Sequence, residues 1–279
     1  MKIGIVTDST SDISAQEAAA NQITVIPAIL VIDGKQYIDG KGLSREEYYN
    51  RLPTLSPPPT TASPSSGTFA STYQKLFSNG VEKIFSIHVS QKLSGIVNAA
   101  EIAAQNFNDR VKVIDSGQLS LGLGFQVLGA AQAAINGTSI EKIHETLKNI
   151  QQRLRVVAML DTLEQLKRSG RVNWLRSSVG SLLRVKLFLE VKDSEVLRLG
   201  ETRTRSKGIR RLTDMIESAA PYEQLAIVHT NAREEAFQLA EKFSSLVSNP
   251  PLIRNVTTVI GTHVGVNAIG FISIRADNA

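Results

Sequence analysis

The sequence contains no cysteine, few aromatic residues and no long hydrophobic run. Without cysteine, the chain has neither disulfides nor thiolate metal sites. No apolar run approaches the ~18 residues of a membrane-spanning helix, and the first stretch, MKIGIVTDSTSD, turns polar too early for a signal peptide. We therefore expect a soluble, cytoplasmic protein with no membrane span. Aromatic residues make up 5% of the chain, with a single tryptophan, which argues against a stacking platform for single-stranded nucleic acid.

The common catalytic motifs are also missing. The chain has no GxxxxGKS/T phosphate loop, no GxSxG nucleophile elbow and no HExxH zinc motif. The glycine-rich stretch GLGFQVLG lacks the GxGxxG spacing of a dinucleotide-binding turn. The four histidines, His88, His144, His229 and His263, are scattered without the spacing of a metal site. The sequence thus gives little support for a self-contained enzyme or a resident metal.

Asp8 and Asp115 each end a short apolar run that is typical of a β-strand. Residues at the carboxyl ends of parallel strands face the binding crevice of an α/β sheet. Asp8 is followed by Ser9 and Thr10, without the second aspartate that aspartyl-phosphate enzymes place two residues on. We favour turn-forming and cap-forming roles for both aspartates. The alternative is a small-molecule phosphotransferase or hydrolase that uses them, with a metal, in the crevice.

Strand-like and helix-like segments alternate along the first 160 residues. Strands are expected at 2–8, in 23–38 on either side of a turn at Asp33-Gly34, and at 83–89, 111–116 and 155–160. Helices are expected after a cap at Ser11 or Asp12, over 44–52 and 67–78, from residue 94, over 119–135, and after a capping box of Thr138 and Glu141. This alternation predicts a largely parallel sheet that is covered on both faces.

The pattern changes near residue 160. Residues 161–186 read as basic helix, 187–201 as a hairpin around Lys192-Asp193-Ser194, and 206–260 as two further pairs of strand and helix. The final stretch, VIGTHVGVNAIGFISI, begins at Val259 and reads as a corner between two strands, with His263 among three glycines. We place a domain boundary near 155–162 and expect a mixed α+β second domain.

Hydroxyl side chains stand at two junctions between a loop and a helix. The proline-rich stretch PTLSPPPTTASPSSGTF and the stretch HVSQKLSGIVNAA both place serine or threonine just before a helix. Unpaired backbone N–H groups and the helix dipole favour an anion there, although each such residue is also an ordinary cap. Together with the glycine-bracketed His263, the two junctions indicate a small-anion pocket built from neutral donors.

The net charge of +5 leaves a basic nucleic-acid-binding module as another alternative. It would depend on Arg168, Arg171, Arg176, Arg184, Arg203, Arg205 and Lys207. These charges alternate with core-type residues and lack aromatic partners, so we expect no nucleic acid partner.

An ordered set of motifs resembles the DegV family of fatty-acid-binding proteins. The motifs are DSTSDI, PTTASPSSGTF, VSQKLSG, VIDS, LKRSGRV with SLLRVK, and GTHVG, and they span about residues 2–275. The resemblance implies two α/β domains with an apolar ligand tunnel between them. Residues 1–160 would form an N-terminal Rossmann-like domain with a largely parallel sheet, and residues 161–279 a C-terminal mixed α/β domain.

The resemblance implies a long-chain fatty acid such as palmitate (hexadecanoate) as the ligand, with no cofactor and no catalytic residue. The carboxylate would be bound by Thr61, Ser94, Gly95 and His263, with Ser63, Ser65 and Thr262 next to these contacts. The protein would be the lipid-presenting subunit of a bacterial fatty acid kinase, whose ATP-dependent partner makes the acyl phosphate. Arg171 and Arg203 would contact that partner or the nucleotide phosphates, and contact with a membrane surface would be transient.

The sequence departs from the family pattern at three places. The proline-rich loop reads Thr61-Ala62-Ser63-Pro64-Ser65 where T-S-Q-P-S is more usual. Ile96 follows the L-S-G motif in place of threonine, and Val266-Asn267 stands where the glycine motif usually continues with proline and glycine. Proline would have fixed φ in the turn after His263. The three changes spare the proposed contact residues and bear on fine ligand preference.

Overall fold

The computed structural model describes residues 1–175 and 185–277, and the chain forms two compact units. The first unit contains residues 1–29 and 62–152, and the second contains residues 30–61 and 153–279. The single boundary near residue 160 that the sequence suggests differs from this division in two respects. Residues 153–160 belong to the second unit, and residues 30–61 pack with the later half of the chain. Leu30, Tyr48, Tyr49 and their neighbours form an apolar cluster there, against which Val266 packs. No local sequence pattern reveals such long-range packing.

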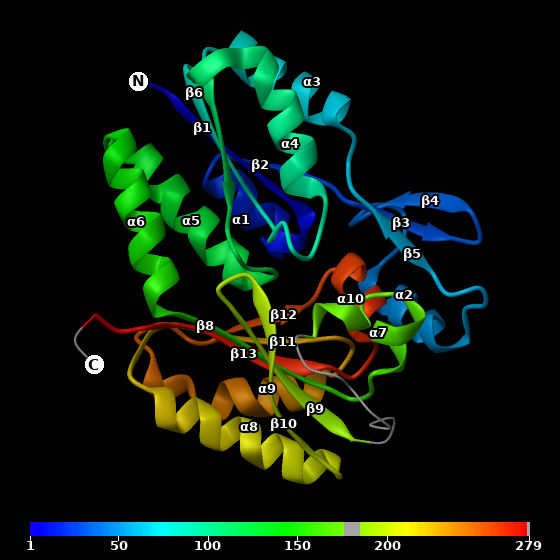
Figure 1. Cartoon of the computed structure of the whole chain (residues 1–279). Coiled ribbons are helices and arrows are strands. Elements are labelled where there is room, and N and C mark those ends of the chain that lie inside the picture. Colours follow the sequence, from blue (N-terminus) through cyan, green and yellow to red (C-terminus); the bar gives the residue numbers. More distant parts are fainter. Residues whose placement is uncertain (176–184, 278–279) are drawn as a thin grey trace. The chain divides into compact units, whose positions relative to one another are not determined.

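The first unit is built on a parallel sheet of four strands in the order β2-β1-β6-β7. Strands β1, β2 and β6 are labelled in Figure 1. Its strands are β1 (Ile3–Asp8), β2 (Ile23–Ile26), β6 (Lys83–His88) and β7 (Val111–Asp115), and its helices include α1 (Ala15–Ala20), α3 (Ser66–Ser78), α4 (Ile96–Ala104), α5 (Leu121–Ile135) and α6 (Ile140–Arg153). Successive strand residues point to opposite faces. Phe85 packs against His144 of α6, while Ser86 hydrogen-bonds Tyr73 of α3 at 2.8 Å. The prediction of a parallel sheet covered on both faces is confirmed.

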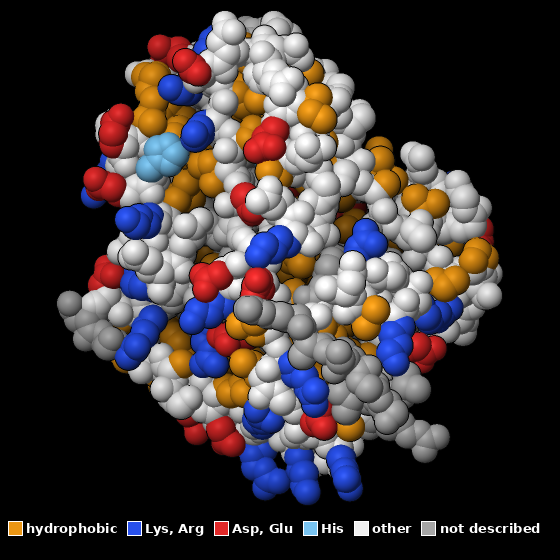
Figure 2. Space-filling model, in the orientation of Figure 1, with side chains coloured by type: hydrophobic (Ala, Val, Ile, Leu, Met, Phe, Trp, Pro, Cys, Tyr) orange, Lys and Arg blue, Asp and Glu red, His pale blue; other side chains and the backbone are white. Residues whose placement is uncertain are grey.

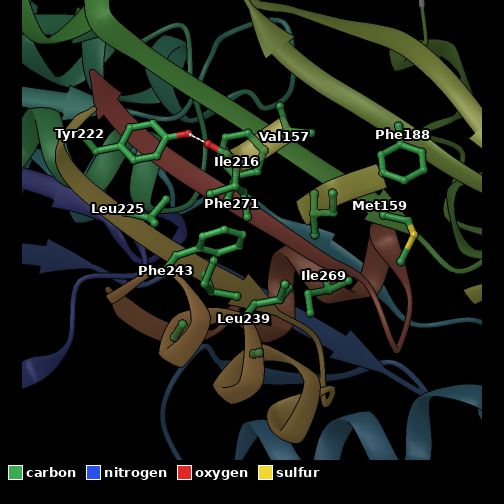
Figure 3. Packing of buried hydrophobic residues seen from close by; sticks show 14 residues of the cluster. Val157, Met159, Phe188, Ile216, Tyr222, Leu225, Leu239, Phe243, Ile269 and Phe271 are labelled. Carbon is green, nitrogen blue, oxygen red and sulfur yellow. Dashed lines mark hydrogen bonds between the residues drawn. The ribbon is translucent and has the colours of Figure 1, made fainter. Parts of the chain in front are cut away.

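The second unit contains a mixed sheet in the order β10-β9-β8-β13-β11-β12. Its strands are β8 (Leu154–Leu160), β9 (Lys186–Lys192), β10 (Glu195–Thr202), β11 (Tyr222–His229), β12 (Leu252–Asn255) and β13 (Ile269–Arg275). Strands β11 and β12 run parallel, and the other neighbours run antiparallel. Helices α8 (Arg205–Ala219) and α9 (Arg233–Lys242) supply Ile216 and Leu239 to an apolar core with Val157, Met159 and Phe271 of the sheet (Figure 3). Burial of these side chains stabilises the packing of helices on sheet.

A small sheet in the order β4-β3-β5 and several short helices also belong to the second unit. These elements are β3 (Ile29–Ile32), β4 (Lys35–Ile38), β5 (Thr60–Ala62), α2 (Arg45–Arg51), α7 (Glu164–Arg168) and α10 (Thr258–Val264). Asp33 and Gly34 both have positive φ, as a two-residue hairpin turn between β3 and β4 requires. Turns of 3-10 helix lie at Ser9–Ser11, Leu52–Thr54, Gln105–Arg110, Val172–Trp174 and Ser244–Leu246.

Two helices begin later than the sequence predicts. Helix α1 is capped by Ser14 in a capping box, not by Ser11 or Asp12, because residues 9–11 form a 3-10 turn of their own. Helix α6 is capped by Ser139, whereas the hydroxyl of Thr138 bonds back to a carbonyl of α5. In both places, several neighbouring hydroxyl or carboxyl residues could serve as caps, and tertiary packing decides among them.

The predicted basic helix over 161–186 is described only in part. Residues 164–168 form α7 and residues 172–174 a 3-10 turn, while 176–184, with Arg176 and Arg184, lie outside the described residues. The predicted hairpin around Asp193 and Ser194 is confirmed, since both residues have positive φ between the antiparallel strands β9 and β10. In the part of the chain that the structure describes, no helix is long and apolar enough to cross a membrane.

Candidate functional site

His263 lies in a helix, and the predicted strand corner is wrong. Residues 258–264 form α10, and a strand begins only at residue 269. The backbone N–H of Gly265 donates to the carbonyl of Gly261 at 2.8 Å and closes the helix. His263 therefore occupies the last turn of a helix of seven residues, and it is 5% exposed.

The three glycines around His263 serve three different purposes. At Gly261 a Cβ would overlap the ring of Tyr49, so α10 can approach α2 closely only without a side chain there. Gly265 has φ 80° and ψ 179°, a conformation that is open almost only to glycine. At Gly270 a Cβ would overlap the backbone of the neighbouring strand β8. The motif therefore combines close packing with a reversal of the chain beside the histidine.

Thr61 and His263 are joined by a hydrogen bond although they lie 202 residues apart in the chain. The hydroxyl oxygen of Thr61, in the middle of β5, is 2.9 Å from Nε2 of the ring. Both residues belong to the second unit, and both were named from the sequence as carboxylate contacts. The structure thus brings this pair of predicted residues together.

The ring of His263 is neutral at physiological pH. Its pKa is lowered from 6.5 to about 4, chiefly because burial disfavours the charged ring and in addition because of the positive charge of Arg171. A neutral imidazole has one N–H donor and one acceptor nitrogen. One hydrogen of the Thr61–His263 pair is used in their mutual bond, so the pair can offer the other, from the hydroxyl or from the ring, to an anion without providing a counter-charge.

Ser63 and Ser94 form a second hydroxyl pair, in the first unit. Their oxygens are 3.4 Å apart. Ser94 lies in the turn between β6 and α4, where its backbone N–H donates to the carbonyl of Ser90 at 3.1 Å. Gly95 is the exposed N-cap of α4, and a Cβ there would lie 3.6 Å from the hydroxyl of Ser63. Two hydroxyls beside the positive end of a helix dipole suit the binding of an anion.

Ser65 and Thr262, which were named from the sequence as neighbours of the contacts, have structural roles. Ser65 is exposed and caps α3, where its hydroxyl accepts the backbone N–H of Thr68 at 3.2 Å. The hydroxyl of Thr262 donates to the carbonyl of Thr258 at 2.8 Å and so accepts from the hydroxyl of Tyr48, 2.6 Å away. Ser65 thus starts a helix, and Thr262 fastens α10 to α2.

Asp39, Tyr48 and Tyr49 hold α10 in place and were not identified from the sequence. The carboxylate of Asp39 accepts hydrogen bonds from the hydroxyls of Thr257 and Thr258 at the start of α10. The hydroxyl of Tyr49 donates to a backbone carbonyl just before the helix at 2.7 Å. Both tyrosines are buried. One signal for the tyrosines was present in the sequence, the adjacent Tyr-Tyr pair in the otherwise polar helix REEYYNR. Adjacent side chains of a helix point in different directions, so two buried rings need packing partners on more than one side of the helix.

The two arginines named as partner contacts differ in their surroundings. Arg171 is half-buried, lies three residues after the end of α7, and is close enough to His263 for its charge to lower the pKa of the ring. Arg203 is exposed and lies in the link between β10 and α8. Arg171 is thus placed near the histidine and Arg203 at the surface, and their contact with a partner stays a prediction.

Asp8 and Asp115 form the turns and caps that we favoured for them. Asp8 is fully buried, accepts the backbone N–H of Thr10 at 3.0 Å and lies 3.0 Å from Nδ1 of His88. Asp115 accepts the backbone N–H of Gly117 at 2.8 Å. Strand β6 separates the strands that carry the two aspartates. Over residues 1–175 and 185–277, no group of three or more His, Asp or Glu side chains is placed to hold a metal ion.

Comparisons with known proteins agree with this fold. A family model described as "Uncharacterised protein, DegV family" matches residues 2–276. A DegV domain-containing protein of Staphylococcus aureus is 32% identical over 275 residues, which cover 97% of this chain and 98% of the relative. A fatty-acid-binding DegV family protein from Thermus thermophilus has a TM-score of 0.88 at 28% identity, with 99% of this chain and 100% of that chain covered. DegV from Bacillus subtilis, described as a fatty acid binding protein, has a TM-score of 0.86 at 30% identity, with the same coverage. From one end to the other, the chain belongs to the DegV family.

Proposed function

We propose that this protein binds a long-chain fatty acid and that Thr61, Ser94, Gly95 and His263 receive its carboxylate. The observation that carries the proposal is the 2.9 Å hydrogen bond between Thr61 and His263. It joins two residues from distant parts of the sequence that the resemblance implies as carboxylate contacts. Two family members of 28% and 30% identity are described as fatty acid binding, which supports the same class of ligand.

The donors suit a carboxylate that must stay reactive. An ionised carboxylate only accepts hydrogen bonds, and the hydroxyls of Thr61 and Ser94 and the N–H of Gly95 donate without carrying charge. His263 is neutral because its pKa is lowered to about 4, so the head group is not held in a strong ion pair. A tail of ~16 carbons, at ~0.8 kcal/mol per buried methylene, contributes on the order of 10 kcal/mol before ordering costs. The head-group contacts therefore supply orientation more than affinity.

The bound fatty acid is presented to an ATP-dependent kinase subunit. In that step a carboxylate oxygen forms a bond to the γ-phosphorus of ATP held by the partner, the bond to the ADP oxygen breaks, and acyl phosphate and ADP result. An acidic partner fits the basic surface of the second unit. Figure 2 shows Lys and Arg side chains gathered near α8 and β10, where the exposed members are Lys192, Arg198, Arg203, Lys207 and Arg210.

The first experiment is mass spectrometry of an organic extract of the purified protein, followed by binding of palmitate to Ser94→Ala. A near-stoichiometric fatty acid is expected in the extract. Loss of one hydrogen bond to a carboxylate costs ~1.5–3 kcal/mol, so Ser94→Ala should weaken palmitate binding about tenfold or more. The control is Ser71→Ala, since Ser71 is an exposed residue of α3 whose hydroxyl bonds a carbonyl of its own helix. Unchanged affinity in Ser94→Ala would remove Ser94 from the site.

Presentation to the kinase is tested separately with Arg203→Ala. We expect palmitate binding to stay intact while partner-dependent phosphorylation falls and becomes more sensitive to salt, because exposed charges act mainly on association. Lys148→Ala, which removes an exposed charge from α6, is the control. If lipid affinity fell and partner affinity did not, Arg203 would belong to the lipid site or to the fold.

A further inference from the structure

The turn from Gly265 to Ala268 ends α10 and contains no proline. Gly265 and Asn267 have positive φ values of 80° and 59°. A helix of seven residues does not hold its geometry alone in water. The position of His263, two residues before Gly265, therefore depends on the groups that fix this turn.

Thr230 fixes the turn through four hydrogen bonds. Its hydroxyl donates to the carbonyl of Gly265 at 2.7 Å and accepts the N–H of Ala268 at 2.8 Å. Its backbone N–H donates to the carbonyl of Ala268 at 2.9 Å, and its carbonyl accepts the N–H of Asn267 at 2.7 Å. Thr230 is fully buried and directly follows β11, whose antiparallel partner β13 begins just after the turn. Since a hydroxyl is one donor and also an acceptor, it satisfies two buried backbone groups at once.

Arg205 adds a further contact to the same turn. Its guanidinium donates to the carbonyl of Asn267 and forms ion pairs with Asp161, at 3.3 Å, and with Glu235. The carbonyls of residues 265, 267 and 268 thus all have donors from outside the turn. A turn that lacks proline is held in one conformation by Thr230, just after β11, and by Arg205 at the start of α8.

We propose that Thr230 is a positioning residue for His263, because it fixes the end of α10 and thereby sets the contact between the His263 ring and the hydroxyl of Thr61. The link to lipid binding rests on the function proposed above, whereas the placement of the ring is a property of the second unit alone. Removal of the hydroxyl would leave a buried carbonyl and a buried N–H unpaired. The turn would then shift to recover partners, and the last turn of α10 would move with it.

The test compares Thr230→Val, which keeps the shape and removes the hydroxyl, with Thr230→Ser, which keeps the hydroxyl. Tyr222→Phe is the matched control, because it also removes a buried hydrogen bond of the second unit, from Tyr222 to the carbonyl of Ile216 at 2.6 Å (Figure 3). The first measurement is the NMR titration of the His263 ring, assigned with His263→Gln. The second measurement is the affinity for palmitate.

In Thr230→Val the ring should gain solvent, its titration should move about one pH unit upward, and palmitate should bind about tenfold more weakly. Thr230→Ser and Tyr222→Phe should stay close to the wild type in both measurements.

A wild-type His263 titration in a folded Thr230→Val variant would overturn the proposal. An altered titration with unchanged affinity for palmitate would overturn its link to binding. If the wild type bound no palmitate, the proposed function would fail, and the titration would still decide the role of Thr230. Thr230→Ala, which also removes the hydroxyl, replaces Thr230→Val in both measurements if the valine variant does not fold.

Discussion

At the scale of single residues, His229 and His263 couple the stability of the protein to pH. The pKa of each is lowered from 6.5 to about 4, mainly by burial and further by a neighbouring arginine, Arg233 or Arg171. Histidines of the unfolded chain titrate near ~6.5. Between about pH 6.5 and pH 4 the unfolded chain therefore binds more protons than the folded protein, and stability falls as the pH falls through this range.

His229→Asn should make the protein less sensitive to acid. The asparagine oxygen can replace Nδ1 of His229 as acceptor of the Ala232 N–H, which is 3.2 Å away, and it does not titrate. Each buried histidine contributes about 2–3 kcal/mol to the loss of stability between pH 7 and pH 4. Between pH 7 and pH 4 the variant should therefore lose about 2–3 kcal/mol less stability than the wild type. The measurement is the free energy of unfolding in urea at pH 7, 5.5 and 4. Equal losses in both proteins would show that His229 is not held neutral by the fold.

At the scale of elements, the contact of α10 with α2 depends on the absence of a side chain at Gly261. An alanine there gains about 1 kcal/mol of helix propensity but overlaps the ring of Tyr49, and overpacking costs about 1–3 kcal/mol. We expect Gly261→Ala to be destabilised and to bind palmitate more weakly, because His263 lies in the same helix. Gly67→Ala is the control, since an added Cβ in α3 meets only the Ser65 hydroxyl, at 3.7 Å. The measurement is the free energy of unfolding of both variants in urea. A Gly261→Ala variant that is as stable as the Gly67→Ala variant would contradict the packing argument.

The same helix shows why part of the site could not be predicted from the sequence. Elements that follow from local patterns, such as the β3–β4 turn at Asp33-Gly34, α3 and the β9–β10 hairpin, match the structure closely. The segment TVIGTHV is rich in β-branched residues, which favour strands. It is held as a helix because Asp39 and Tyr48 bond it from distant segments and Thr230 bonds the turn that follows it. The glycines around His263 mark that residue as a candidate for an anion pocket, whereas the choice of Thr61 and Ser94 among the neighbouring hydroxyls rests on the family resemblance.

At the scale of the whole molecule, Ser94 belongs to the first unit, whereas His263 belongs to the second. In the chain, only Ala62 separates Thr61 of the second unit from Ser63 of the first. A ligand that binds the folded protein and not the unfolded chain shifts the equilibrium towards the folded state. Its binding free energy then stabilises the entire chain against unfolding.

Thermal unfolding with palmitate and with hexadecanol distinguishes the head group from the tail. A ligand at a free concentration of about 100 times its Kd stabilises the folded protein by about 2.7 kcal/mol, which corresponds to a rise in Tm of several degrees for a chain of this size. Hexadecanol has the same tail length but lacks the carboxylate, so at equal free concentration it should raise Tm less than palmitate. Ser94→Ala should narrow the difference between the two ligands, because it removes a donor that only the carboxylate uses fully. Equal shifts for both ligands in the wild type would mean that the tail alone is recognised, and Thr61, Ser94 and His263 would then lose their proposed role.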